Sequence, residues 1–272
     1  MKPRIFAPFV SLSRSPTFYR TGRLFSRTKS DRLLDEFAAD ENALVAALDV
    51  TVPLHIAEVV QQAEIRFGHI DVLVNNAGYG YLCAVEEGED DEVRAMFETN
   101  VFGVMNMTKA VLSGMRRRRR GQIVNISSMG GLIGSPGVGY YNASKFAVEG
   151  LSEALAKETA ALGITVTIVE PGPFRTEWAG RSLKTAKTPI ADYAPSAGAR
   201  QAAIQGYSGA QPGDPVRAAE AIIHAVESPK PPLHLLLGRP AFDLTAEKFK
   251  TFTAEMEKWR DVTLSADFPD EN

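Results

Sequence analysis

A tyrosine and a lysine are spaced so that they could act as a proton-transfer pair. Tyr141 and Lys145 are four residues apart in the run Tyr140-Tyr141-Asn142-Ala143-Ser144-Lys145. On a helix, this spacing places both side chains on one face. A phenol has a pKa of about 10, and a cation within about 4–6 Å lowers that pKa by stabilising the phenolate. We therefore expect Tyr141 to exchange a proton with a carbonyl or alcohol oxygen. A solvated helical Tyr and Lys is the alternative.

Two polar segments follow apolar runs and are expected to lie near this pair. Ser128 follows the run 123–126, and Asn75-Asn76-Ala77-Gly78 closes the run 70–74. Both segments stand where strands should end, and ligands of parallel sheets bind outside the carboxyl ends of the strands. The ends of two more expected strands place Asp49 and Pro171 at the same edge.

The elements that must position these residues alternate along the chain from residue 22 onward. Short β-rich runs alternate with helical stretches, which predicts a parallel sheet covered by helices on both faces. Gly68 and Gly163 are expected to end two of the helices. The expected strands are 24–28, 43–50, 71–75, 122–127, 165–170 and 233–237, and the expected helices are 31–39, 54–67, 90–115 and 141–162.

Composition favours one α/β domain and excludes several classes of protein. The chain has 272 residues, of which 44% are hydrophobic and 23% charged, enough for a large core. A net charge of −3 gives no electrostatic footprint for nucleic acid. The single cysteine, Cys83, cannot form an internal disulfide, which suits a reducing, cytoplasmic location. No apolar run approaches the roughly 18 residues of a membrane span.

Several motifs occur together in one order. They are Asp49-Val50, Asn75-Asn76-Ala77-Gly78, Asn100, Ser128, Tyr141 with Lys145, Pro171-Gly172 and Thr176. With these residues the chain resembles the short-chain dehydrogenase/reductase family in its classical form, over about residues 22 to 240. The resemblance implies a Rossmann-like, doubly wound parallel sheet. It also implies a homodimer or homotetramer.

The resemblance implies an NAD(P)-dependent oxidoreductase that transfers a hydride between a nicotinamide cofactor and a carbonyl or secondary alcohol. Ser128 would hydrogen-bond the reacting oxygen, and Tyr141 would pass the proton. Lys145 would lower the tyrosine pKa, and Asn100 would hold a water that links Lys145 to solvent. The alternatives are a strand-end hydroxyl cap for Ser128 and a helix-interior polar contact for Asn100.

The resemblance also assigns residues to the cofactor. Asp49 and Val50 would face the adenine, Asn75, Asn76, Ala77 and Gly78 would support the adenosine ribose, Pro171, Gly172 and Thr176 would border the nicotinamide, and Tyr141 and Lys145 would hold its ribose. The second expected strand ends in Arg27-Thr28-Lys29 with no acidic residue. Arg27 or Lys29 could therefore meet a 2′-phosphate, which predicts NADP, with NAD possible. Two solvated loop cations are the alternative.

The amino terminus departs from the family pattern. The family opens with a strand and a turn, Thr-Gly-x-x-x-Gly-x-Gly, that receives the cofactor pyrophosphate, but Gly22 is the only glycine before Gly68. By register, Gly22 onward matches the second strand, so the first strand and the phosphate-binding loop are doubtful. Pro8 argues against a central strand over 4–10, because proline lacks an N–H donor. Weaker cofactor binding is expected.

Three functional hypotheses therefore stay open. The chain could be an active oxidoreductase, a cofactor-deficient relative that acts as a binding or scaffold protein, or the inactive product of a truncated or frameshifted gene. The expected division is an atypical segment 1–21, a Rossmann-like domain 22–240 and a helical tail 241–272. The basic, acid-free residues 2–29 could instead suit a transit peptide.

The substrate is expected to be a small molecule, a lipophilic ketone or alcohol. Residues 173–215 place aromatic residues amid Pro and Gly, as in a mobile flap over an apolar substrate. Tyr79-Gly80-Tyr81 could also line the site. Plain packing is the alternative for this aromatic cluster of Phe174, Trp178, Tyr193 and Tyr207.

Two further surface features are expected to be structural. Phe249, Phe252, Met256 and Trp259 recur at helical spacing, which predicts a packing or subunit-contact helix over 245–259. The arginine run 116–120 follows the expected helix 90–115, where cations complement the helix dipole. An RNA or membrane contact is the alternative for that run.

Overall fold

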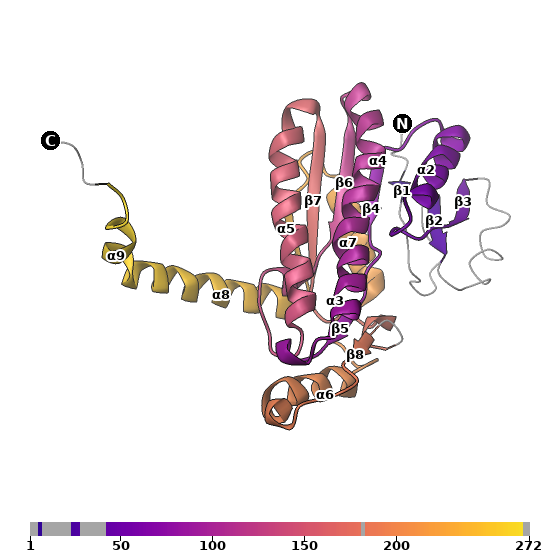
Figure 1. Ribbon diagram of the computed structural model, residues 1–272. Coiled ribbons are helices and arrows are strands. Elements are labelled where there is room, and N and C mark those ends of the chain that lie inside the picture. The colour runs from indigo at the N-terminus through magenta and orange to yellow at the C-terminus, as the bar shows by residue number, and fades with distance from the viewer. Residues whose placement is uncertain (1–4, 7–22, 28–41, 181–182, 269–272) are drawn as a thin grey trace.

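A seven-stranded parallel sheet organises the chain (Figure 1). The structure, a computed structural model, describes residues 5–6, 23–27, 42–180 and 183–268. Its sheet has the order β3-β2-β1-β4-β6-β7-β9, and every pairing is parallel. The strands are β1 Ile5–Phe6, β2 Arg23–Arg27, β3 Ala43–Ala47, β4 Val72–Asn75, β6 Gly121–Ile126, β7 Ile164–Pro171 and β9 His234–Leu237.

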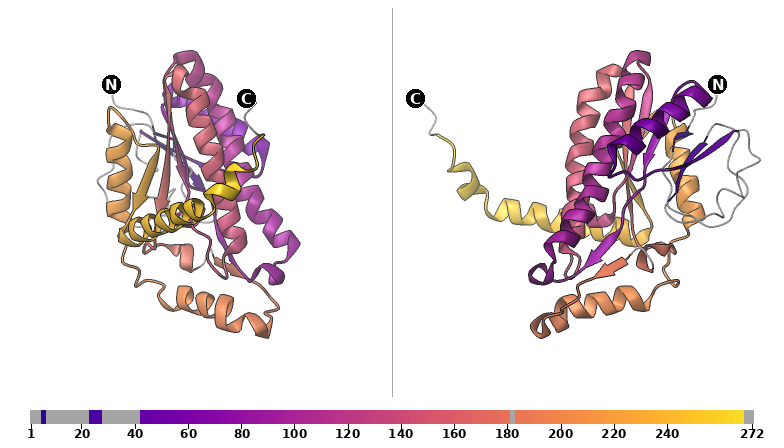
Figure 2. Two further views of the ribbon diagram at one scale, coloured as in Figure 1. Left: turned by 90° about the vertical axis from the view of Figure 1, so that its left-hand side faces the viewer. Right: turned by 45° about the vertical axis from the view of Figure 1, so that its right-hand side comes forward.

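Helices cover both faces of this sheet, as the alternation in the sequence predicts (Figure 2). The helices α2 Pro53–Phe67, α4 Gly103–Arg118 and α5 Gly139–Thr159 lie on one face, and α7 Pro215–Glu227 lies on the other. Alternate residues of a strand point to opposite faces. Leu73 accordingly packs in the core under α2 and α4, while Val72 and Val74 pack in the core under α7.

The helix ends follow the expected signals. Gly68 ends α2, and Gly163 has a φ of 69°, a left-handed conformation that favours glycine. Arg119 ends α4 with a φ of 55°, so the arginine run lies at a helix terminus as expected. The Arg118 guanidinium donates to the Ile70 carbonyl at 2.6 Å, and all five arginines are exposed.

The long helix expected over 90–115 forms with an internal change of geometry. It begins as α3, Asp90–Phe97, widens into a π-helical segment, Glu98–Phe102, and continues as α4. Such π-helical segments occur mostly at functional sites, because the extra residue re-aims the side chains around it. Asn100 lies inside this segment and is completely buried.

The centre of the sheet corrects the expectation for the amino terminus. Ile5 and Phe6 form a short strand between β2 and β4, with Phe6 opposite Leu24 and Leu73. The prediction that residues 4–10 could not supply a central strand is therefore wrong for these two residues. Pro8 lies beyond them, so its missing N–H does not interrupt the ladder. The segment in which the family places its phosphate loop, which the sequence makes doubtful, and the expected helix 31–39 lie outside the described residues.

Residues 173–215 form a layer over one end of the sheet. The strand β8, Leu183–Thr185, pairs in parallel with β5, Gly80–Leu82, and α6, Ala199–Gly206, follows it. We call the layer from Pro173 to Pro215 the flap. One short helical turn, Val85–Glu87, follows β5. Three more lie within the flap: Glu177–Ala179, Ala191–Tyr193 and Ala194–Gly198.

The carboxyl-terminal helices extend away from the sheet. In Figures 1 and 2, α8, Arg239–Lys258, and the short α9, Arg260–Leu264, project beyond α5. The expected helix over 245–259 is thus present. Among the described residues, no helix has the length and apolar character required to cross a membrane.

Candidate active site

The structure brings Tyr141, Lys145 and Ser128 together at the carboxyl end of β6. Tyr141 and Lys145 lie on the first turns of α5, and Ser128 comes two residues after β6. The Lys145 ammonium donates to the carbonyl of Ile126, the last residue of β6, at 2.8 Å and lies 5.9 Å from the centre of the Tyr141 ring. Tyr141 hydrogen-bonds Ser128. The expected helical face and the expected strand end therefore meet.

Burial controls the ionisation of this pair. Desolvation raises the pKa of Tyr141 to about 12, and the hydrogen bond with Ser128 opposes the rise only in part. Desolvation also lowers the pKa of Lys145 to about 8, partly opposed by Glu149. That Lys145 lowers the pKa of Tyr141 stays a prediction, because the shift of this pKa in the structure comes from desolvation and from the Ser128 hydrogen bond.

Ser128 is held by the loop between β6 and α5. Its hydroxyl accepts a hydrogen bond from the Gly130 amide at 3.0 Å and caps the turn Met129–Gly131. Asn142 on α5 donates to the Gly130 carbonyl at 2.8 Å and accepts from the Ser135 amide at 2.9 Å. Ser128 is thus a local cap and a partner of Tyr141. That it hydrogen-bonds the reacting oxygen stays a prediction.

Asn100 fixes the strand that follows the Asn-Asn-Ala-Gly segment. Its side-chain oxygen accepts from the Tyr79 amide at 3.1 Å, and its side-chain nitrogen donates to the Tyr79 carbonyl and to the Ser144 hydroxyl at 3.0 and 3.1 Å. The polar contact in the helix interior is therefore present. That Asn100 holds a water for Lys145 stays a prediction.

Asn75 starts a buried chain of side-chain hydrogen bonds. Its nitrogen donates to Thr108 at 3.2 Å and to Asn125 at 2.8 Å, and Asn125 donates to Ser152 at 2.8 Å. This chain ties β4 and β6 to α4 and α5. Because Asn75 is 4% exposed, its side chain acts inside the protein, whereas Asn76, Ala77 and Gly78 remain half-buried at the edge of the sheet.

The segment Asn76 to Gly78 passes close to Lys145. A Cβ atom at Gly78 would lie 3.0 Å from the Asn100 side-chain oxygen and 3.6 Å from the Lys145 nitrogen. A larger residue at this position would push against both groups. Gly78 thus allows the backbone to approach Lys145 and Asn100 closely.

The two residues assigned to the adenine, Asp49 and Val50, differ in their exposure to solvent. Asp49 is exposed, and its carboxylate accepts from the Thr51 amide at 2.9 Å and from the Thr51 hydroxyl at 2.7 Å. These hydrogen bonds lower the pKa of Asp49. Val50 is 6% exposed and packs in the core against Gly103 at the start of α4. The side chain expected to face a ligand is therefore a core side chain.

The residues assigned to the nicotinamide border the site at the end of β7. Pro171 ends β7, and the Gly172 amide donates to the Leu237 carbonyl at 2.9 Å. The Thr176 hydroxyl accepts from the Trp178 amide at 3.3 Å. Arg27 is the last residue of β2, which places its backbone at the same edge of the sheet, and Lys29 lies outside the described residues.

Trp178 packs against Tyr141. Its ring lies 5.2 Å from the Tyr141 ring at an angle of 54°, a tilted packing that aromatic pairs favour. A Cβ atom at Gly80 would lie 2.7 Å from the Trp178 ring, so Gly80 makes room for it. In the sequence, Trp178 is recognisable only as one of several aromatic residues of the flap, because its partner Tyr141 lies 37 positions earlier.

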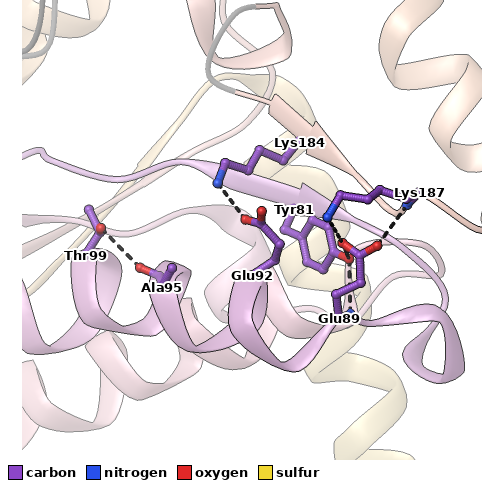
Figure 3. A network of polar contacts seen from close by, with 7 residues as sticks. All are labelled: Tyr81, Glu89, Glu92, Ala95, Thr99, Lys184 and Lys187. Carbon is purple, nitrogen blue, oxygen red and sulfur yellow. Dashed lines mark hydrogen bonds and ion pairs between the residues drawn. The ribbon is translucent and has the colours of Figure 1, made fainter.

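Ion pairs fasten the flap to α3 (Figure 3). Lys184 contacts Glu92 at 2.5 Å, and Lys187 contacts Glu89 at 3.7 Å. The Glu89 amide donates to the Tyr81 hydroxyl at 3.2 Å. Tyr81 is 1% exposed, so the expectation that it lines the site is wrong, while Tyr79 is half-buried beside Lys184.

Cys83 lies in the apolar cluster under Tyr141. Its amide donates to the Gly137 carbonyl at 3.0 Å, and its side chain is 1% exposed. Burial raises the pKa of this thiol to about 11, so the group stays protonated at neutral pH. A nucleophilic role is excluded by this protonation and burial.

Comparison with known proteins gives one consistent set of relatives. The sequence model of the short chain dehydrogenase family matches residues 23–187. The oxidoreductase BOA17 of Botryotinia fuckeliana is 37% identical over 83% of this chain and 82% of its own length. A 3-ketodihydrosphingosine reductase of Bacteroides thetaiotaomicron is 47% identical over 55% of this chain and 56% of its own length.

A solved structure agrees over most of the chain. The crystal structure of a short-chain dehydrogenase from Streptomyces avermitilis superimposes with a TM-score of 0.84 and 38% sequence identity. The match covers 91% of each chain. An experimental structure therefore matches this chain over most of its length.

Proposed function

Because this chain belongs to the short-chain dehydrogenase/reductase family, we propose that Tyr141, Ser128 and Lys145 carry its hydride-transfer chemistry. The protein is an NAD(P)-dependent oxidoreductase that acts on CH–OH and C=O groups. The observation that supports our assignment of roles is the contact of Tyr141 with Ser128, next to the buried Lys145 ammonium.

The geometry supports a division of labour among these side chains. The Ser128 hydroxyl and the Tyr141 phenol can both donate to one carbonyl oxygen. Since burial raises the pKa of Tyr141 to about 12, the phenol is protonated at neutral pH and is ready to act as an acid. This protonation state favours carbonyl reduction, in which the oxygen gains a proton as the carbon gains a hydride.

The nicotinamide cofactor supplies the hydride when it is bound, and the chain supplies its position and the proton. Asn76 to Gly78 are half-buried after the carboxyl end of β4, and Gly172 follows the carboxyl end of β7, where ligands of parallel sheets bind. We place the nicotinamide beside Gly172 and Thr176. Asp49 remains available at the adenine end, whereas Val50 contributes through packing.

We propose NADP as the preferred cofactor. The run Arg27-Thr28-Lys29 at the end of β2 contains no acidic residue, so we expect its cations to favour a 2′-phosphate. A solved relative of the family also contains NADP. A ligand at 100 times its dissociation constant should stabilise the protein by about 2.7 kcal/mol, so thermal unfolding should shift further with NADPH than with NADH.

This titration also separates the open hypotheses for the function. Arg27→Ala should reduce the NADPH shift and spare the NADH shift. A cooperative unfolding transition that neither nucleotide moves would favour the cofactor-deficient binding protein. The absence of a cooperative transition in the full chain would favour a damaged amino terminus.

We propose a lipophilic ketone or alcohol as the substrate. The hydrophobic cluster that contains Tyr141 also includes Trp178 of the flap and the half-buried Tyr79. The relative named for 3-ketodihydrosphingosine supports a substrate with a long hydrocarbon part.

Cytoplasmic location is the proposal that fits a single free cysteine.

The deciding test is Tyr141→Phe, which removes the phenolic proton and keeps the ring. We expect turnover to fall by at least about 10³-fold, within the range of acid–base catalysis, with unchanged melting and NADPH binding. Tyr140→Phe is the matched control, because the Tyr140 hydroxyl donates to the Val85 carbonyl at 2.8 Å, outside the catalytic group. Near-normal turnover in Tyr141→Phe would overturn the proposed roles.

We also propose that the chain pairs with a second copy through its carboxyl-terminal helices. Ala241 and Thr245 are buried at the base of α8. The same helix face continues outward with Phe249, Phe252 and Met256, which are 50–56% exposed. An apolar stripe that leaves the protein surface in this way needs a partner.

Area and charge favour a second copy as that partner. Phe249, Phe252, Met256 and Trp259 are each about half exposed, so the arm that α8 and α9 form on each copy offers roughly 400 Å² of apolar surface. If each copy lays its arm on the other copy, the two arms and the two surfaces that they cover would bury about 1,600 Å² in total, the size of a stable interface. A membrane is disfavoured, because residues 246–268 carry four basic and five acidic side chains, whereas interfacial helices have a basic polar face.

A further inference from the structure

Two glutamates and a histidine form a cluster that takes no part in the proposed reaction. Three elements meet there: α5 contributes Glu149, β7 contributes Glu170, and β9 contributes His234. Glu149 is 4% exposed, and Glu170 is completely buried. The His234 side chain is 41% exposed. The cluster therefore lies mostly inside the protein and reaches the surface at the histidine.

The cluster has the donor atoms and the spacing of a metal site. One carboxylate oxygen of each glutamate and one ring nitrogen of His234 all lie within 4.8 Å of one another. The His234 Nδ1 atom is 2.7 Å from a Glu170 oxygen and 3.9 Å from a Glu149 oxygen. Zinc with tetrahedral bonds of about 2.1 Å holds its ligand atoms about 3.4 Å apart. The two measured distances lie on either side of that value, so side-chain shifts of roughly half an ångström would complete the geometry.

A buried hydroxyl outside the acidic cluster also points to a missing ligand. Ser127 follows β6 and is 3% exposed, and its hydroxyl has no hydrogen-bond partner among the described residues. A Cβ atom at Gly131 would lie 2.6 Å from the Ser127 hydroxyl and 2.8 Å from a Glu149 oxygen. Both oxygens therefore border the same space, which the glycine leaves open. Both oxygens of Glu149 and one oxygen of Glu170 are unpaired in the same way. Unpaired buried acceptors are costly, so a bound group is expected at this place.

The neighbouring cationic side chains leave Glu149 without a close partner. Lys145 lies one turn earlier on α5 and donates to the Ile126 carbonyl at 2.8 Å. Among the described residues, only His234 forms an ion pair with Glu149, and its Nδ1 atom is already hydrogen-bonded to Glu170. Two buried carboxyl groups thus share one imidazole. A divalent cation between them would neutralise both.

The outer side of His234 also resembles the surroundings of a metal-bound histidine. Its Nε2 atom is 3.9 Å from Glu153, whose side chain is 45% exposed. Metal-bound histidines usually donate their second ring N–H to a carboxylate, a carbonyl or water, which fixes the tautomer. This tautomer leaves Nδ1 free of a proton and able to bind a metal. Because both side chains are partly exposed, a cation can enter from solvent on this side.

We propose that Glu149, Glu170 and His234 bind a Zn²⁺ ion, with the Ser127 hydroxyl beside the fourth position. The inference goes beyond the proposed function, because the hydride and proton transfers described above need no metal. The imidazole favours zinc over Mg²⁺ and Ca²⁺, which prefer oxygen ligands. The bound ion would join α5, β7 and β9 and would therefore stabilise the fold.

Zinc binding to the metal-free, full-length protein is the first test. EDTA treatment followed by gel filtration gives the reference state. Burial raises the pKa of Glu149 to about 7, so a proton competes with the cation in acid and the titrations are made at pH 8. Calorimetry should show that a single equivalent of Zn²⁺ binds, and the unfolding temperature should rise. The same concentration of Mg²⁺ should leave the unfolding temperature unchanged.

Variants of the ligands locate the bound ion. Glu149→Gln and His234→Gln each remove a ligand, so zinc affinity should fall by more than about 100-fold, the largest effect typical of losing an outer partner. Glu158→Gln, exposed on α5, and His55→Gln, exposed on α2, are the matched controls and should bind zinc as the wild type does. No saturable binding to the wild type would overturn the proposal and would leave a proton or a water in this place. Equal affinity in the wild type and both ligand variants would overturn it too.

A spectroscopic readout on the wild type keeps the proposal testable if a ligand variant fails to fold. The chain has four histidines. In protein labelled with ¹⁵N-histidine, zinc should move the Nδ1 resonance of His234 while its Nε2 atom keeps a proton and the other three rings stay unchanged. A His234 resonance that saturating zinc leaves in place would overturn the site.

Discussion

At the scale of single residues, burial decides how the catalytic side chains ionise. Tyr141 and Lys145 are each shifted toward the neutral form, and Glu149 is shifted in the same sense. The spacing of Tyr141 and Lys145 is readable in the sequence, and so is their shared helix face. The direction in which the tyrosine pKa shifts cannot be read from the sequence, because it depends on the desolvation that strands, flap and helix create together.

The shift of Glu149 has a consequence for stability. Its pKa rises from 4.5 unfolded to about 7 folded, so folding favours the protonated form. The associated stability is fully present below pH 4.5 and is lost as pH rises through about 7, on the order of 3 kcal/mol in total. Glu149→Gln should therefore be more stable than the wild type at pH 8 and nearly equal at pH 4.5.

Urea unfolding at the two pH values measures this difference. Glu153→Gln serves as the control for removing a surface carboxylate from the same helix, and it should change the free energy of unfolding little at either pH. A Glu149→Gln protein that is less stable at pH 8 would show that the ionised carboxylate, paired with Lys145 and His234, stabilises the fold.

At the scale of elements, the flap is positioned by contacts distant in sequence. The β-rich and helical runs predict the strands and helices of the sheet, including β4, β6 and α5. The pairing of β8 with β5 has no such signal, because two three-residue strands are too short to produce a pattern. The π-helical turn at Asn100 is also hidden, since its residues suit an ordinary helix.

We predict that Lys184→Met loosens the flap. Lys184 contacts Glu92 at 2.5 Å and lies over the Tyr79 ring, and methionine keeps the apolar stem but removes the charge. A partly exposed ion pair contributes less than about 1 kcal/mol, so KM for the substrate should rise about twofold to fivefold while kcat changes little. Steady-state kinetics at low and high salt checks this.

The neighbouring pair provides the control for this prediction. Lys187 contacts Glu89 at 3.7 Å and is 76% exposed, so Lys187→Met should change KM less than Lys184→Met. High salt should reduce the difference between the wild type and Lys184→Met, because salt screens surface charges. Equal KM values for all three proteins would mean that the flap is held by apolar packing instead.

At the scale of the whole molecule, the projecting helices should set the assembly. Phe252→Glu places a charge in the apolar stripe of α8, which should convert the proposed dimer into a monomer. Ala254→Glu is the matched control, because two residues along a helix turn a side chain by about 200°, away from the stripe. Light scattering after size exclusion measures the mass of each protein.

The unfolding transition separates assembly from folding in this experiment. The Phe252→Glu monomer should keep a cooperative unfolding transition, because the substitution lies outside the core of the sheet. A wild type that is monomeric at micromolar concentration would contradict the proposed pairing, as would a dimer that Phe252→Glu leaves intact. The apolar stripe is readable in the sequence, but its projection away from the sheet is not.

The buried Cys83 is a built-in probe of local opening in the protein. A thiol with a pKa of about 11 and 1% exposure reacts with a disulfide reagent only during moments when its surroundings open. The rate of that reaction therefore reports the fraction of time for which the region under Tyr141 is open. Since the chain has one cysteine, every modified molecule records this same event, and no label has to be engineered to follow the opening.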